Sequence, residues 1–221
     1  MQSAFANQTG GERFERLAAD LAEAARLLGG RGWTPATSSN FSVRLDETHC
    51  AVTISGRDKT RLTAADLMVL RLDGTPIAAP DVDTRPSAET ALHLALYRRD
   101  PDTGAVLHTH APNAVLTTRL APDAEQITLE GYELLKAFEG VTSHDHSLIV
   151  PVVDNSQDID ALASEADQRL DRLDDAVCWA YLIRDHGAYA WGRDLAASLR
   201  HLEALDYLLG IELELGRLRR D

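Results

Sequence analysis

The chain has 221 residues, of which 44% are hydrophobic, and a formal net charge of −13. A chain of this length buries a sizeable core, as one domain or at most two. Its acidic residues are scattered and its lysines and arginines form no cluster, which argues against a nucleic-acid-binding protein. Only two cysteines occur, Cys50 and Cys178, outside any CxxC motif. No disulfide framework is therefore expected, and a reducing cytoplasm fits best.

The sequence also argues against export and membrane insertion. The N-terminal stretch "MQSAFANQTGGERFERL" lacks the basic start and long apolar run of a signal peptide. The apolar stretches are far shorter than the roughly 20 residues that span a bilayer. We therefore expect a cytoplasmic protein without a membrane partner.

Apolar residues recur at helical spacing in some segments and alternate in others. In chain order the pattern predicts a helix over 12–28, strands over 40–45 and 50–55, a short helix, a strand and a turn over 63–77, a helix over 87–99, a strand over 105–110, a helix over 112–120, a short helix over 131–138, a strand over 147–153, a helix over 156–173, strands over 177–183 and 188–192, and a helix over 194–218. This order predicts an α/β fold in which helices cover both faces of a largely antiparallel sheet, in a single domain over 1–221.

Two features of the predicted elements leave a choice open. Pro151 lies inside the strand over 147–153, which suggests an edge position or a bend. The final helix carries leucines on more than one face. That excess fits a subunit contact, and it fits a helix buried in its own core nearly as well.

The segment "GAVLHTHAPNA" places His108 and His110 one residue apart at the end of an apolar strand. Residues i and i+2 of a strand point to the same face, so both imidazoles can reach one cation. Zn²⁺ readily takes imidazole nitrogen, and catalytic sites usually supply three protein ligands with one open position. The candidate third ligand is His186 in "RDHGAYAWG", where Gly187 allows a tight turn.

The spacing by itself does not establish a metal site. A second H-x-H pair, His144 and His146, lies beside an aspartate in a polar turn, where histidines stay hydrated at little cost. His108 and His110 would then be two ordinary histidines at the edge of a core strand. The remaining histidines, His49, His93 and His201, are interpreted as surface or helix residues.

Six segments together resemble the class II aldolase/adducin-type family: "TSSNFSVRL", "TISGRDK", "RPSAETALHLALY", "GAVLHTHAP", "GYELLKAF" and "DHGAYAWG". They occur in the family's order and spacing and run from about residue 33 to 192. The resemblance implies a three-layer α/β/α sandwich that assembles as a homotetramer. It also implies one Zn²⁺ per subunit, held by His108, His110 and His186.

Two longer segments, "ITLEGYELLKAFEG" and "SHDHSLIVPVVDNSQDI", resemble the branch of the family that dehydrates a ketose 1-phosphate. This narrower resemblance implies that Glu133 is the catalytic acid/base; from the residues alone, Glu133 also fits a solvated glutamate in the first turn of a helix. Glu89 is the rival carboxylate, because the glutamate of the matching segment transfers the proton in the family's sugar-phosphate aldolases. It could instead complete a capping box near Ser87.

By resemblance, three loops of small residues bind the substrate's phosphate. Small side chains allow close approach, and hydroxyls and backbone N–H groups donate to an anion. The candidate substrate-binding residues are Ser39, Asn40, Ser55, Gly56 and Ser87, with Lys59 adding positive charge. Each of them also fits a plain turn residue. Many relatives have glycine at the position of Ser39, which puts the shape of that loop in question.

The lead interpretation is thus a Zn²⁺-dependent dehydratase of a small phosphorylated ketose. The nearest enzymatic alternative is an aldolase or epimerase of the same family, favoured by Glu89. A non-enzymatic alternative is an interaction domain like the adducin head. That head lacks the metal histidines, so the presence of all three argues against it.

Overall fold

The computed structural model describes residues 11–174 and 176–219. The first ten residues, which contribute to the expectation of no signal peptide, lie outside that part. The described elements are α2 (Gly11–Gly30), η1 (Pro35–Thr37), β1 (Asn40–Arg44), β2 (His49–Thr53), η2 (Lys59–Arg61), η3 (Ala64–Asp66), β3 (Leu67–Arg71), β4 (Pro76–Ala78), α3 (Thr90–Arg99), β5 (Ala105–Thr109), α4 (Pro112–Leu120), β6 (Gln126–Glu130), η4 (Glu133–Ala137), β7 (Ser147–Val153), α5 (Ile159–Asp171), β8 (Ala180–Ile183), β9 (Gly187–Gly192) and α6 (Leu195–Leu218).

The strands form one continuous sheet in the order β4-β3-β2-β1-β5-β9-β8-β7-β6. Neighbouring strands are antiparallel except for β7 and β8, which run parallel. The central strand β5 is buried along its whole length. It places His108 opposite Asn40 of β1 and opposite Tyr189 of β9. The prediction of a largely antiparallel sheet is confirmed.

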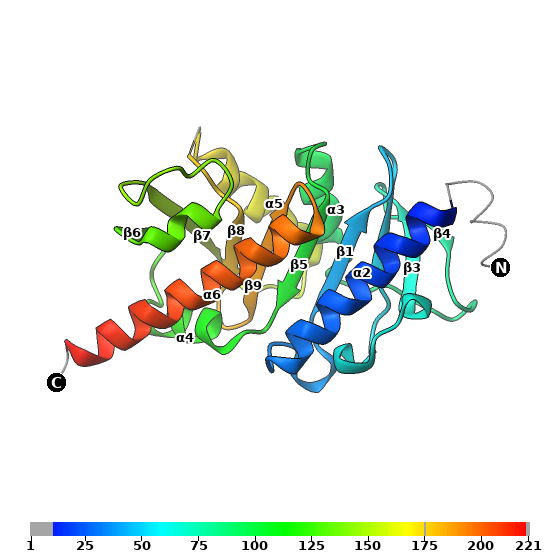
Figure 1. The fold of residues 1–221 in the computed structure, drawn as a ribbon, viewed down its shortest axis with the longest axis horizontal. Helices are drawn as coiled ribbons and strands as arrows, with labels where there is room; N and C mark the ends of the chain where they lie inside the picture. The colour runs from blue at the N-terminus through cyan, green and yellow to red at the C-terminus, as the bar shows by residue number, and fades with distance from the viewer. Residues whose placement is uncertain (1–10, 175, 220–221) are drawn as a thin grey trace.

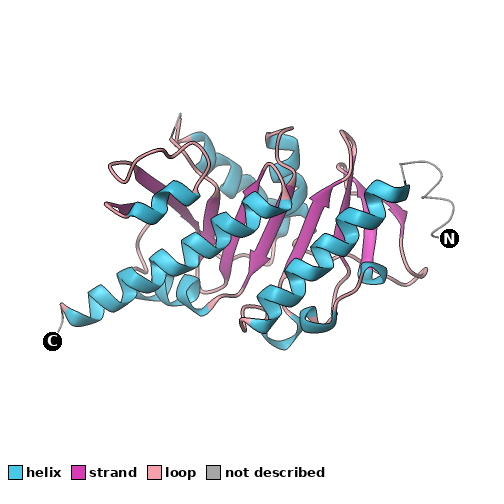
Figure 2. Ribbon diagram, viewed as in Figure 1, coloured by secondary structure: helices cyan, strands magenta, loops and turns pink. Residues whose placement is uncertain are grey.

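Helices cover both faces of this sheet. Helices α2, α4 and α6 pack on one face, where α2 and α6 are seen in front of the strands, and α3 and α5 pack on the other (Figures 1 and 2). Successive residues of a strand point to opposite faces, and Leu107 and Val106 accordingly belong to different cores. The three-layer α/β/α sandwich is therefore confirmed.

Three local expectations need correction. Helix α3 begins at Thr90, without a side-chain cap, so Ser87 lies before the helix. Strand β7 is interior, and its Pro151 lies where the strand changes partner from β6 to β8; no edge position is needed there. His93 and His201 do lie on helices, as expected, but both are fully buried rather than exposed. Each ring has hydrogen-bond partners inside the protein, which offset the cost of removing its nitrogens from water.

The two cysteines and the lengths of the helices bear on the expected absence of disulfides and of membrane spans. Cys50 and Cys178 are free thiols, in agreement with the absence of a disulfide framework. Among the described residues, no helix combines the length and the apolar character needed to cross a bilayer.

His201 links the fold to pH. Its Nε2 accepts a hydrogen bond from the Glu139 backbone N–H, and its Nδ1 donates to the Trp191 carbonyl oxygen. Burial lowers the pKa of His201 to about 4. The unfolded chain, with an imidazole pKa near 6.5, therefore takes up a proton first as the pH falls. The stability that the neutral ring contributes is complete above about pH 6.5 and is lost toward pH 4.

Between pH 7 and pH 5, we expect the wild-type chain to lose about 2 kcal/mol more of its unfolding free energy than the His201→Phe variant loses. Urea denaturation of both proteins at the two pH values measures this difference. Equal losses in the two proteins would show that His201 is not held neutral by its surroundings.

Candidate active site

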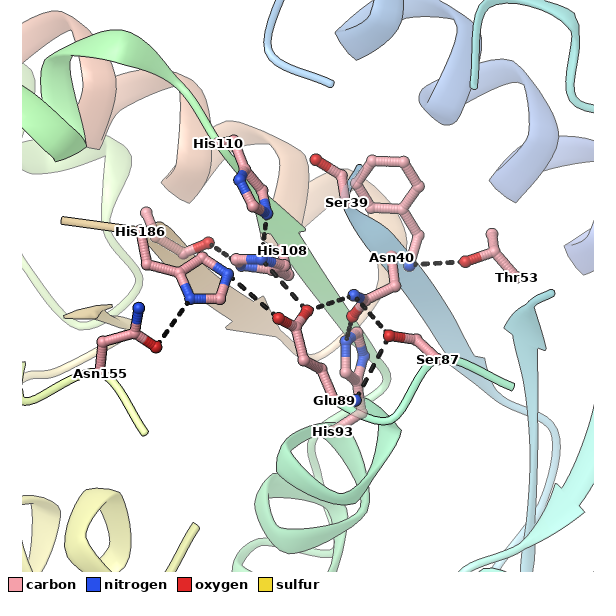
Figure 3. A network of polar contacts seen from close by, with 12 residues as sticks. Ser39, Asn40, Thr53, Ser87, Glu89, His93, His108, His110, Asn155 and His186 are labelled. Carbon is pink, nitrogen blue, oxygen red and sulfur yellow. Dashed lines mark hydrogen bonds and ion pairs between the residues drawn. The ribbon is translucent and has the colours of Figure 1, made fainter. Parts of the chain in front are cut away.

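Three histidines meet at one end of the sheet. His108 lies on β5, His110 follows the last residue of that strand, and His186 lies in the turn between β8 and β9. One ligand nitrogen from each ring lies within 4.8 Å of the other two. The Nε2 atoms of His108 and His110 are 3.1 Å apart. Figure 3 shows the rings turned toward one another. The structure thus brings together the three residues that the sequence suggested as metal ligands.

Hydrogen bonds behind two of the rings determine which nitrogen is free. Nδ1 of His108 is 3.0 Å from the Ala188 carbonyl oxygen, so it carries the proton and leaves the lone pair on Nε2. Nδ1 of His186 lies 3.3 Å from Oδ1 of Asn155, with the same consequence. Burial lowers the pKa of His108 well below its usual value and that of His110 to about 4. The rings of His108 and His110 are therefore neutral, as metal ligands must be.

One buried nitrogen supports a cation at this point. Nε2 of His186 is buried and makes no hydrogen bond within the described part of the chain, although Oε1 of Glu89 lies 3.1 Å away. An unpaired buried polar atom is costly, and a divalent cation between the three rings would satisfy it. The residues present therefore fit a metal ion with three imidazole ligands.

The third histidine is close to the other two because two backbones nearly touch. Gly187 follows His186, and a Cβ at this glycine would lie 2.1 Å from the Thr109 carbonyl oxygen. Only a residue without a side chain permits this approach. On the other side, the His110 backbone N–H donates to the Trp33 carbonyl oxygen at 3.0 Å and fixes the chain just after β5.

Glu89 lies beside the histidines at the start of α3. Its Oε2 is 3.4 Å from Nε2 of His108 and accepts a 2.7 Å hydrogen bond from Nδ2 of Asn40. Burial by itself would raise the Glu89 pKa, but the contacts with His186 and His108 and the Asn40 hydrogen bond outweigh it and hold the pKa below its usual range. The carboxylate is ionised and faces the cluster, so the capping-box interpretation is wrong.

A cavity of about 430 Å³ opens in front of the histidines and Glu89. Loops from four parts of the chain form its wall. The lining residues are Ala36, Thr37, Ser38, Ser39, Asn40, Ile54, Ser55, Gly56, Ser87, Ala88, Glu89, His110, Asn155, Ser156, Gln157, Ile159 and His186. Five of the six residues suggested for phosphate binding are among them.

The loop before β1 has a conformation that usually requires glycine. Ala36, Thr37 and Ser39 have positive φ values, and that of Ser39 is 71°. Such backbone is uncommon outside glycine and tends to occur at functional sites. The Ser39 hydroxyl donates to the Trp33 carbonyl oxygen at 3.3 Å. Ser39 therefore occupies a left-handed turn, the backbone region that favours glycine.

Lys59 is placed differently from the other suggested phosphate ligands. It is buried, and its ammonium group donates to the carbonyl oxygens of Thr37 and Arg57 at 3.0 and 2.8 Å. Burial lowers its pKa to about 8. It is not part of the cavity wall. Through these two hydrogen bonds the Lys59 side chain links the loop that contains Thr37 to the loop that contains Arg57.

Glu133 lies apart from the cavity of its own chain. It begins η4, its side chain is 72% exposed, and its Oε1 is 2.5 Å from the Lys136 ammonium. The hydrogen bond and the charge of Lys136 lower its pKa. The wall of the cavity does not include it. Within one chain, the structure does not bring Glu133 to the histidines.

The sequence did not single out the residues that follow β7. Asn155, Ser156 and Gln157 line the cavity opposite the phosphate loops, and Asn155 also supports His186. The segment "PVVDNSQDI" contains them, but a polar run after a strand is typical of any loop. Only the position of β7 beside β8 brings them to the site.

Comparison with known proteins places these features in a family. Residues 19–213 match the model of the class II aldolase and adducin N-terminal domain. The methylthioribulose-1-phosphate dehydratase of Xanthomonas campestris pv. campestris (strain 8004) is 54% identical over 209 residues, which cover 91% of this chain and 94% of that protein. The protein of the same name from Stenotrophomonas maltophilia (strain R551-3) is 51% identical over 207 residues, 94% of each chain.

Solved structures share the fold at lower identity. The L-fuculose-1-phosphate aldolase of Thermus thermophilus superposes with a TM-score of 0.71 at 24% identity, covering 95% of this chain and 98% of that one. A sugar-phosphate aldolase from Thermotoga maritima gives a TM-score of 0.70 at 19% identity, covering 93% and 97%. These similarities agree with the α/β/α sandwich.

The close approach at Gly187 gives a testable prediction. In a Gly187→Ala variant the turn must move away from Thr109, which separates His186 from the other two rings. We expect the affinity for zinc to fall at least about tenfold, because one of three ligands is displaced. The matched control is Gly30→Ala, since a Cβ at Gly30 meets nothing within 4 Å. Titration with zinc measures the affinity of each variant. Equal affinities would contradict the claim that Gly187 is needed to place His186 beside the other two rings.

Proposed function

This chain belongs to the class II aldolase and adducin family, and on that premise we propose that it is a zinc-dependent dehydratase. Its substrate is 5-methylthioribulose 1-phosphate and its product the 2,3-diketo-5-methylthiopentyl 1-phosphate, a step of methionine salvage. The observation that carries the proposal is one cavity lined by His110, His186, Glu89 and the small-residue loops, with the buried His108 converging on the other two histidines. The names of relatives more than 50% identical over most of the chain support it.

In this proposal His108, His110 and His186 hold one Zn²⁺ per subunit. One nitrogen from each ring would provide the three ligands, and a catalytic zinc site with three protein ligands usually keeps an open position for water or substrate. When bound, the ion supplies a Lewis acid that polarises the carbonyl at C2 of the ketose. The hydrogen bonds that two ligating rings make with Ala188 and Asn155 hold them in the required tautomer.

The phosphate of the substrate is held by the loops that contain Ser39, Ser55, Gly56 and Ser87. Hydroxyl groups and backbone N–H groups suit an anion in a chain of net charge −13, because they provide local donors against an unfavourable overall field. Gly56 has a φ of +74°, so its backbone can face the cavity in a conformation that side chains disfavour.

Dehydration removes the proton at C3 and the hydroxyl group at C4 as water. The resulting enol becomes the 2,3-diketone. Glu89 is suited to take the C3 proton, because its carboxylate is ionised, lines the cavity and lies 3.4 Å from Nε2 of His108, one of the residues that would hold the metal.

The departing hydroxide needs a proton donor, and the resemblance assigns acid/base chemistry to Glu133. Since Glu133 lies outside the cavity of its own chain, the proposed role requires another copy of the chain to supply it. Beside Lys136 its pKa is lowered, which disfavours the protonated form. Burial at a subunit contact would raise that pKa and make Glu133 a proton donor.

A homotetramer is part of the proposal. Large apolar side chains are exposed on three neighbouring elements, α4, η4 and α6, where α6 contacts both of the others. They are Leu116, Leu120, Leu134, Tyr207 and Leu218. Exposed apolar groups on adjoining elements favour a protein contact, and Leu134 directly follows Glu133 in the chain. We further propose that the chain is one domain over 1–221 and acts in the cytoplasm.

Glu89 also favours a second candidate function, that of a sugar-phosphate aldolase or epimerase. A carboxylate beside a metal-held carbonyl can serve carbon–carbon bond cleavage as well as dehydration. Dehydration breaks a carbon–oxygen bond and aldol cleavage breaks a carbon–carbon bond, so the products of the reaction distinguish the two functions.

The assay of the proposed function offers methylthioribulose 1-phosphate to the purified chain, with its zinc content measured. We expect one zinc per subunit and formation of the diketone. Release of glycolaldehyde phosphate or dihydroxyacetone phosphate from ketose phosphates, without diketone, would instead assign the aldolase activity. Zinc-loaded protein that forms none of these products would refute both.

Three glutamine variants separate the roles of the carboxylates. Glu89→Gln and Glu133→Gln should both retain zinc and lose turnover by at least about 100-fold, the contribution typical of general acid–base catalysis. Glu130→Gln is the matched control, because Glu130 is exposed on β6 and accepts a hydrogen bond from Ser147, away from the cavity wall. Turnover near the wild-type level in either of the first two variants would remove that glutamate from its assigned role.

A further inference from the structure

A chain of buried hydrogen bonds runs from Glu89 into the core behind the cavity. Nδ2 of Asn40 is 2.7 Å from Oε2 of Glu89, and Oδ1 of Asn40 is 2.5 Å from Nε2 of His93. Nδ1 of His93 is 2.8 Å from the Ser42 hydroxyl, which is 2.8 Å from the hydroxyl of Tyr97. Figure 3 shows Asn40 between Glu89 and His93. All but Glu89 are buried, His93 and Ser42 completely.

The carboxylate of Glu89 determines the direction of the first two bonds. An ionised carboxylate only accepts, so the amide nitrogen of Asn40 must face it and the amide oxygen must face His93. Nε2 of His93 must then carry a proton. Burial lowers the pKa of His93 to about 3, so the ring is neutral and has no second proton for Nδ1.

The remaining two bonds follow from that tautomer. With Nδ1 of His93 unprotonated, the Ser42 hydroxyl donates to it and its oxygen accepts from the Tyr97 hydroxyl. Burial raises the pKa of Tyr97 well above its usual value, so this phenol keeps its proton. All four hydrogens therefore point toward Glu89. Bonds aligned in one direction polarise one another and hold the chain in a single arrangement.

With the proton of His93 on Nε2, the opposite orientation of the Asn40 amide is unfavourable at both ends. A rotated amide would set its oxygen against the Glu89 carboxylate and its NH₂ group against the N–H of His93. Neither contact is a hydrogen bond, and the Asn40 and His93 side chains are removed from water. Glu89 and the Nε2–H of His93 thus hold the Asn40 amide from both ends, and the Asn40 amide in turn anchors the carboxylate.

We propose that His93 is a positioning residue for proton transfer: its Nε2–H fixes the Asn40 amide so that Glu89 is held against the histidine cluster. The inference rests on the proposed function, because it takes Glu89 as the base. It also gives the Asn40 side chain a new role. Both polar ends of that amide are engaged inside the protein, so the side chain supports the base instead of binding the phosphate.

The test compares two substitutions of His93 in the full-length, zinc-loaded protein. His93→Phe keeps a planar ring but has no donor for Asn40. We expect kcat to fall about 10- to 100-fold, the loss typical of a reacting group displaced by about 1 Å, with KM within about threefold and zinc content unchanged. His93→Gln can direct an amide N–H at the Asn40 oxygen, and it should recover kcat to within about fivefold of wild type.

A matched control separates positioning from a loss of stability. His201 is likewise fully buried with both ring nitrogens bonded, but it lies in the other core. His201→Phe should lower the thermal midpoint as His93→Phe does and leave kcat unchanged. The proposal is overturned if His93→Phe keeps kcat within about threefold of wild type, if His93→Gln restores none of the loss, or if His201→Phe loses kcat equally.

Crystal structures of the wild-type and His93→Phe proteins provide a readout that does not depend on turnover. In the variant we expect the Asn40 amide to be rotated and the Glu89 carboxylate to have moved off His108. An unchanged Glu89 would overturn the inference. If the wild-type protein does not dehydrate methylthioribulose 1-phosphate, the proposed function fails, and the two crystal structures still decide whether His93 positions Glu89.

Discussion

The site depends on the close approach between the end of β5 and the start of β9. A Cβ at Gly187 would lie 2.1 Å from the Thr109 carbonyl oxygen, so this contact exists only with glycine at that position. It brings His186 to the two histidines that β5 and the residue after it supply. The three converging rings then form a site for a cation, and the carboxylate of Glu89 adds negative charge that attracts such an ion.

The polar groups of the site are arranged in two layers. Facing the cavity are His110, His186, Glu89 and the small-residue loops; a second layer of groups, of which Asn40 and Asn155 also line the cavity, determines their orientation. Asn155 and the Ala188 carbonyl hold two of the rings, and the hydrogen-bond chain through Asn40 and His93 holds the glutamate. Where this second layer is buried in the tightly packed core, each polar atom needs a definite partner. The catalytic geometry is thereby built into the fold.

Much of the fold could be predicted from local patterns. The short apolar run in "AVLHTH" and the abundant leucines of the last helix predicted elements close to β5 and α6. Patterns were less reliable where a tertiary contact overrides them. Pro151 is interior because β7 changes neighbours there, and α3 starts only at Thr90, directly after the glutamate whose side chain faces the histidines. Neither event leaves a trace in periodicity, since both depend on segments distant in sequence.

The sequence by itself determined which residue types could bind a metal and an anion, because the H-x-H spacing and the small-residue loops are local properties. Only the tertiary structure decided what each residue touches. It joined His93 to Asn40 across 53 positions, and it put Lys59 beneath the loops and Glu133 outside the cavity. The physical reason is that a side chain's burial and hydrogen-bond partner are set by packing between elements, and a one-dimensional pattern does not record which elements become neighbours.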